Sequence, residues 1–210
     1  MPPLCRTERA ALADLLDELG PDEPTLAEGW TTRDLAAHLV IRERRPDASA
    51  GIAVPFLAPY TRGVQAAAAK RPFEDLVAEV RSGPPAWSLF ALPRMDRLLN
   101  TTEYFVHHED VRRAQPGWAP RDLSDRASAT LWKAATGRAR LAFRGVGCGV
   151  VLSRPGADSV TVTSGEPTAV LTGEPQELLL YVFGRKDHAL VEVTGPKDAR
   201  ACLGATSLDV

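Results

Sequence analysis

The sequence predicts an α+β protein that is mainly α-helical, with a helical bundle over residues 1–145 and a small α+β domain over residues 146–210. Up to Gly145 the apolar residues recur at spacings of three and four, the period of amphipathic helices. Beyond Gly145 short β-prone runs separated by Gly and Pro replace this period. With 210 residues, of which 44% are hydrophobic, the chain can bury a packed core.

The predicted helices begin or end at capping residues, Gly or Pro, and they cover residues 7–19, 31–45, 64–70, 72–81, 93–115 and 124–144. The second helix has the clearest start, because Thr31 suits an N-cap and Asp34 stands at the third helical position. Residues 51–63 are predicted as a loop, since two prolines and a glycine interrupt their apolar pattern. These helices make up the expected bundle.

The second part is predicted to contain three short strands, a helix and a last strand, at residues 150–152, 160–162, 169–171, 175–183 and 189–193. Turn sequences separate the first three strands, at Pro155–Gly156 and at Gly165–Pro167. We therefore expect these strands to pair as hairpins.

Charge and hydropathy exclude two classes of partner. The net charge is -2, with no concentrated basic face of the kind that binds nucleic acid. No apolar run approaches the length that spans a bilayer, and Met1–Leu4 lacks the features of a secretory signal. We expect a cytoplasmic protein that binds neither nucleic acid nor a membrane.

The three cysteines, Cys5, Cys148 and Cys202, are far apart in sequence and odd in number. They lack the CxxC spacing of zinc knuckles and do not form the pattern of a disulfide framework. We interpret them as small buried or surface thiols.

A pattern typical of metal sites lies in the predicted helix at 93–115. Glu103 and His107 are four residues apart, so their side chains share one helical face. His38 points toward the interior from the predicted helix at 31–45. A carboxylate on an apolar face costs several kcal/mol unless it is paired or bound to a metal. We predict that His38, Glu103 and His107 bind one divalent metal.

The alternative is a buried polar network without a metal. Glu103 would then pair with an arginine, such as Arg42 or Arg138, while both histidines would be ordinary hydrogen-bonded core residues. Spacing alone does not decide between these interpretations, because Glu and His four apart is a common coincidence.

Neighbouring residues define further alternatives. Asp110, one turn beyond His107, can orient that imidazole from outside the ligand set, or it can be a solvent-exposed partner of Arg113. His108 is turned by about 100° from the ligand face and is the main competitor of His107. His188 is expected to be exposed.

Two imidazoles and one carboxylate suit Zn²⁺, Fe²⁺, Ni²⁺ or Mn²⁺. Three protein ligands leave coordination positions open, as in catalytic rather than structural sites. An open position accepts water, or a thiol that is stabilised as thiolate.

Two segments carry a resemblance to a known family, WTTRDLAAHL at residues 30–39 and EYFVHHEDV at residues 103–111. They resemble the metal-binding domain of the mycothiol-dependent maleylpyruvate isomerase family, which belongs to the DinB-like four-helix-bundle superfamily. The segment GEPQELLLYVFGR at residues 173–185 resembles the small C-terminal domain that accompanies such bundles in actinobacterial proteins.

The resemblance implies a DinB-like bundle in which His38, Glu103 and His107 bind a divalent metal, usually zinc. It also implies mycothiol as thiol cofactor and an arginine from the C-terminal domain that assists catalysis, for which Arg185 is the candidate.

Our leading hypothesis is a metal-dependent thiol transferase or isomerase, in which the metal activates a low-molecular-weight thiol such as mycothiol for attack on a small electrophile. The competing hypotheses are a metal-bound sensor or interaction module without turnover, and a metal-free bundle with a buried polar network. A fold shared by many activities does not decide among them.

Overall fold

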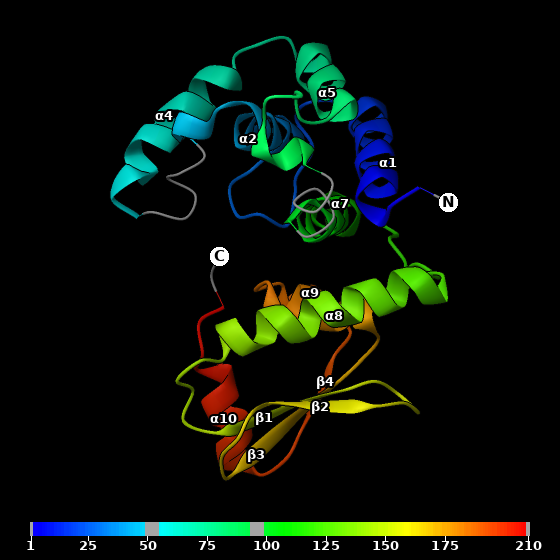
Figure 1. The fold of residues 1–210 in the computed structure, drawn as a ribbon, viewed down its shortest axis with the longest axis vertical. Helices are drawn as coiled ribbons and strands as arrows, with labels where there is room; N and C mark the ends of the chain where they lie inside the picture. The colour runs from blue at the N-terminus through cyan, green and yellow to red at the C-terminus, as the bar shows by residue number, and fades with distance from the viewer. Residues whose placement is uncertain (1, 49–54, 93–98, 209–210) are drawn as a thin grey trace. The chain divides into compact units, whose positions relative to one another are not determined.

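The computed structural model describes residues 2–48, 55–92 and 99–208 (Figure 1). The chain divides into two compact units, residues 1–119 and 120–210. The boundary predicted near Gly145 falls after helix α8 (Asp125–Ala142), whereas the units divide before it. The reason is packing, since α8 packs along α9 (Pro175–Val182) and also contacts β2 (Ser159–Thr163). Helix α8 therefore belongs to the second unit.

The first unit is helical. Its helices are α1 (Leu4–Leu19), α2 (Thr32–Arg44), α4 (Ala58–Ala68), α5 (Phe73–Ser82) and α7 (Thr101–Ala114). Helix α1 packs against α7 and α5, and α2 packs against α4 and α5. Their apolar faces meet in one core, which includes Leu12, Leu16, Leu35, Leu39, Leu76, Val80, Tyr104 and Val111. Each fully buried leucine stabilises this core by about 1.5–3 kcal/mol relative to an exposed one.

Helix α2 starts where the sequence predicts. The backbone N–H of Thr31 donates to Asp34 Oδ2 at 3.0 Å, which satisfies a donor that the first turn would otherwise leave without a partner. The helix ends at Arg44, just before Pro46. This placement puts His38 in the middle of α2, where the backbone is rigid.

Two helices differ from the prediction. Helix α4 begins at Ala58, inside the segment predicted as a loop, and it follows a 3₁₀ turn at Pro55–Leu57. Pro59 is tolerated because it lies in the first turn, where its missing N–H has no helical acceptor to lose. Helix α7 begins at Thr101 after a π turn at 99–100, and residues 93–98 of the predicted helix lie outside the described residues.

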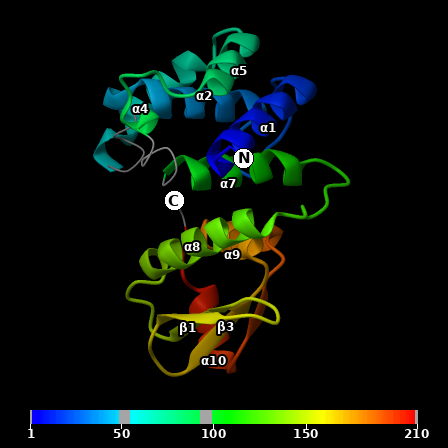
Figure 2. The same cartoon turned by 45° about the vertical axis from the view of Figure 1, so that its right-hand side comes forward.

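The second unit contains a four-stranded sheet with strand order β2-β1-β3-β4. The strands are β1 (Gly149–Ser153), β2, β3 (Thr168–Thr172) and β4 (Glu192–Thr194). Helices α8 and α9 lie side by side next to this sheet (Figures 1 and 2). Helix α10 (Lys197–Gly204), which the sequence analysis did not predict, contacts β3. The predicted α+β class is confirmed, whereas the DinB-like assignment of the first unit stays a prediction.

Strand β3 does not continue a series of hairpins. β1 and β2 form the expected antiparallel hairpin, but β3 pairs with β1 in parallel, so the β2–β3 connection crosses the N-terminal end of β1. The crossing is tight, because a Cβ on Gly149 would collide with the carbonyl oxygen of Gly165. The hairpin predicted at Gly165–Pro167 is therefore wrong, since a glycine in β1 allows the chain to cross instead.

Among the described residues, no helix combines the length and the apolar character that a bilayer crossing would require.

Candidate metal centre

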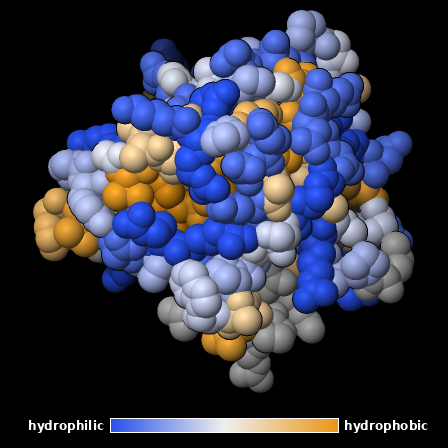
Figure 3. All heavy atoms as spheres, turned by 90° about the horizontal axis from the view of Figure 1, so that it is seen from above, coloured by the Kyte–Doolittle hydropathy of each residue, from blue (hydrophilic) through white to orange (hydrophobic). Residues whose placement is uncertain are grey.

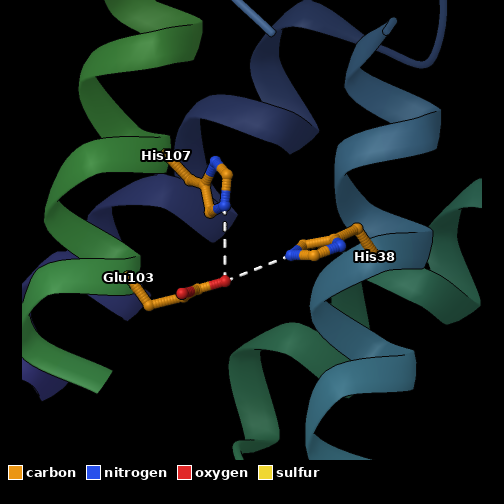
Figure 4. Close-up of side chains that lie close together, drawn as sticks. All are labelled: His38, Glu103 and His107. Carbon is orange, nitrogen blue, oxygen red and sulfur yellow. Dashed lines mark hydrogen bonds and ion pairs between the residues drawn. The ribbon is translucent and has the colours of Figure 1, made fainter. Parts of the chain in front are cut away.

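His38, Glu103 and His107 meet between α2 and α7 in the first unit (Figure 4). Glu103 Oε1 lies 3.1 Å from Nε2 of His38 and 3.3 Å from Nε2 of His107. One ligand atom from each residue falls in a group whose members all lie within 4.8 Å of one another. The structure therefore brings together the three residues that the sequence selected as ligands.

Helix geometry explains this meeting. Glu103 and His107 are one turn apart on α7, and His38 faces them from α2. The imidazole of His38 stands edge-on to that of His107, with ring centroids 5.3 Å apart, and it also contacts the ring of Trp30. The Glu103 side chain keeps 20% of its surface exposed.

Arg42 is a fourth member of the cluster. Its Nε lies 3.3 Å from Glu103 Oε1, and its Nη1 donates to Asn100 Oδ1 at 2.6 Å. The guanidinium also stacks on Phe90, 4.3 Å from the ring centroid. Glu103 is therefore contacted by an arginine, as the metal-free alternative expects, as well as by both imidazoles. Arg138, the other arginine considered, belongs to the second unit and stacks there on Phe183.

The charges of the cluster depend on one another. Burial raises the pKa of Glu103, but hydrogen bonds from His107 and His38, together with the charge of Arg42, outweigh it and hold that pKa well below its usual value. Burial lowers the pKa of His107, but hydrogen bonds between His107 and the carboxylates of Asp110 and Glu103 outweigh burial and raise that pKa to about 9. For His38 burial dominates and lowers the pKa. Near neutral pH the metal-free cluster thus holds a carboxylate, an imidazolium and a neutral imidazole.

Asp110 supports His107 from the side away from Glu103. Its side chain is fully buried, and Oδ2 lies 3.0 Å from Nδ1 of His107. A carboxylate at that position keeps the proton on Nδ1, which leaves Nε2 as the atom available to a metal. The alternative, a solvent-exposed carboxylate, is wrong, because Asp110 is fully buried.

His108 points away from the cluster. Its Nδ1 lies 2.8 Å from Glu8 Oε2, and both side chains are buried between α7 and α1. His107 therefore faces the candidate ligands and His108 faces α1, as the helical rotation of about 100° per residue predicts.

Asn100 is a residue of this region that sequence reasoning missed. It is fully buried and accepts the bond from Arg42. Its position three residues before Glu103, on the same face, was the available signal.

Arg185 and His188 belong to the second unit. Arg185 follows α9, and its Nη1 donates to the carbonyl oxygen of Phe183 at 2.6 Å. Its proposed catalytic role stays a prediction. His188 ends a 3₁₀ turn at Lys186–His188 and is exposed, as expected.

The first unit also has a hollow of about 590 Å³ between α2, α4 and α5. Its lining combines an apolar floor with a charged rim, namely Val40, Ile41, Val64, Ala67 and Ala68 with Arg44, Arg45, Arg71 and Glu79. Figure 3 shows apolar residues ringed by hydrophilic ones on the face viewed from above. Neither His38, Glu103 nor His107 lines this hollow, so it is separate from the candidate metal centre.

The comparisons with known proteins identify the fold. No protein-family model and no curated protein matches the sequence. Among solved structures, the chain is similar to the crystal structure of the mycothiol-dependent maleylpyruvate isomerase, with a TM-score of 0.61 and 17% identity over 91% of this chain and 90% of that one. A histidine-to-alanine mutant of the same enzyme gives a TM-score of 0.60 at equal identity and coverage. The fold is thus shared with that isomerase, as the sequence motifs suggested.

Proposed function

We propose that this chain is a divalent-metal-dependent thiol transferase or isomerase that uses a low-molecular-weight thiol, such as mycothiol, to attack a small electrophile. The observation that carries the proposal is the cluster of His38, Glu103 and His107, with one ligand atom from each within 4.8 Å of the others. The shared fold supports the choice of reaction class, because the similar solved structures are of a mycothiol-dependent isomerase.

The donor set fits a metal ion. Zinc binds imidazole nitrogen and carboxylate oxygen at about 2.0–2.2 Å, so adjacent ligand atoms of a tetrahedral site lie about 3.3 Å apart. The two distances to Glu103 Oε1, 3.1 and 3.3 Å, are close to this value. Zn²⁺ is our first choice, and Ni²⁺, Fe²⁺ and Mn²⁺ suit the same donors.

Each residue has a separate role in this proposal. His38, Glu103 and His107 would hold the metal, and Asp110 would hold the His107 ring in the ligating tautomer. When bound, the metal would supply a Lewis-acid position that stabilises a thiolate at neutral pH. Arg185 remains our candidate for assisting the reaction from the second unit.

The first experiment measures metal content and affinity. Purified protein should contain a stoichiometric divalent metal in elemental analysis, and the variants His38→Ala and Glu103→Gln should lose it. Glu74→Gln, which removes an exposed carboxylate of α5, is the matched control and should retain it. Equal metal content in all four proteins would contradict the proposed ligands.

The second experiment tests turnover. The metal-loaded protein should consume mycothiol together with at least one member of a panel of small electrophiles, and a chelator should abolish this consumption. Metal binding without consumption of any panel member would favour a sensor or interaction module. Absence of metal binding would favour the buried network, which the Arg42–Glu103 ion pair already makes possible.

A further inference from the structure

Two cysteines that are distant in sequence approach each other in the second unit. Cys148 immediately precedes β1, and its side chain is almost fully buried. Cys202 lies on α10 and is partly buried. The structure contains no disulfide between them, and neither residue belongs to the candidate metal centre.

The orientation of α10 turns Cys202 toward Cys148. Along this helix Ala199, Cys202 and Leu203 are the buried or partly buried positions, at the three- and four-residue spacing of one helical face. The thiol of Cys148 donates to the carbonyl oxygen of Ala199 at 3.8 Å, so its sulfur lies against that face, one turn before Cys202.

Burial and the nearby Cys202 thiol raise the pKa of Cys148 to about 11. Cys148 therefore stays protonated near neutral pH, whereas Cys202 is the more accessible sulfur of the pair.

We propose that Cys148 and Cys202 form a redox modification site, at which a peroxide converts the two thiols into a reversible intramolecular disulfide. This proposal is independent of the metal centre and of the proposed enzymatic function. Disulfides in reducing compartments are usually transient and serve redox sensing or catalysis, which suits a thiol pair that is reduced in the resting structure.

The chemistry proceeds in two balanced steps. The Cys202 thiolate attacks one oxygen of hydrogen peroxide, the O–O bond breaks, and Cys202 becomes a sulfenic acid while hydroxide leaves. The Cys148 sulfur then attacks Sγ of Cys202, the S–S bond forms, and the sulfenic oxygen leaves as water after taking the Cys148 proton. Overall the two thiols lose two electrons and two protons, and the peroxide is reduced to two molecules of water.

The bond would tie the start of β1 to α10. The disulfide would close a loop of the chain that contains β1 to β4 and α9, so oxidation would restrain most of the second unit. Reduction by a thiol releases α10 again.

The test uses the full chain with Cys5→Ser, which leaves only the proposed pair. The reduced protein is treated with hydrogen peroxide, unfolded, and labelled with N-ethylmaleimide. We expect both labels to be lost, the unlabelled mass to fall by about 2 Da, and dithiothreitol to restore both labels. Peptide mapping should identify the Cys148–Cys202 linkage within one chain.

Single variants test the order of the steps. Cys148→Ser should accumulate a sulfenic acid at Cys202 that dimedone captures, whereas Cys202→Ser should leave Cys148 unmodified at the same peroxide dose. Two labels that persist after peroxide treatment, or a disulfide that joins two chains, would overturn the proposal. Because the linkage is also mapped in the Cys5→Ser protein, loss of folding in a single variant does not obscure the result.

Discussion

The Glu103 carboxylate is the atom group around which the candidate metal centre is arranged. A single oxygen, Oε1, lies within 3.3 Å of nitrogen atoms from His38, His107 and Arg42. The spacing of Glu103 and His107 could be predicted from the sequence, because both lie on one helix. The contact between His107 and Asp110 could be predicted too, because these residues also lie one turn apart on that helix. The pairing of His108 with Glu8 could not, since Glu8 lies on another helix.

The role of Asp110 leads to a prediction for metal affinity. Asp110→Asn keeps a similar shape but removes the charge that orients His107 and increases its basicity as a ligand. We expect Zn²⁺ affinity to fall by about 10–100-fold, the usual effect of losing such a partner. Competition with a chromophoric chelator measures this, and Asp75→Asn on the exposed surface of α5 is the control. Unchanged affinity in Asp110→Asn would contradict the role.

The raised pKa of His107 predicts a pH dependence in the metal-free protein. Folding raises this pKa from 6.5 to about 9, so its contribution to stability is complete below about pH 6.5 and is lost as pH rises through about 9. Chelator-treated wild-type protein should therefore lose more thermal stability between these pH values than His107→Gln does. Parallel curves for the two proteins would show that His107 is not protonated in the fold.

At the scale of elements, Arg42 and Asn100 connect the two helices that carry the candidate ligands. Arg42 lies one turn after His38 on α2, and Asn100 lies one turn before Glu103 at the start of α7. Their 2.6 Å hydrogen bond therefore links α2 to the start of α7 beside the candidate metal centre.

Removing this connection should weaken the fold and the centre together. Asn100→Ala leaves Nη1 of Arg42 without the Asn100 acceptor, which costs about 1.5–3 kcal/mol for a bond to a charged group. We expect a lower Tm and weaker Zn²⁺ binding, measured by thermal unfolding and chelator competition. Asn100→Asp retains an acceptor and should preserve both properties. A Tm for Asn100→Ala equal to that of the wild type would contradict the structural role.

The elements differ in how well local sequence predicts them. Helix α2 has a capping box, and its start was predicted correctly. The prediction starts helix α4 too late, at Val64, because Pro55, Pro59 and Gly63 interrupt the apolar pattern, although a proline is compatible with a first turn. Strand β3 was expected to pair with β2, but its partner depends on where the chain crosses at Gly149, which a turn motif does not encode.

At the scale of the whole molecule, the chain contains two compact units, and the candidate metal centre lies within the first. A ligand that binds only the folded site stabilises the elements that form it. Zn²⁺ should therefore slow amide hydrogen exchange in α2 and α7, whereas exchange in β1 and β3 should stay unchanged. Mass spectrometry of peptides from both units measures this in one sample. Protection confined to the second unit would place metal binding elsewhere.

The sequence by itself determined the α+β class, most of the helices, and the shared face of Glu103, His107 and Asp110, because these features depend on residues within a few turns of one another. The tertiary structure decided that α8 joins the second unit, that His38 meets α7, and that Cys148 contacts α10, the helix that carries Cys202. These contacts join segments far apart in the chain. Their geometry depends on how whole apolar faces pack, which no local pattern of residues specifies.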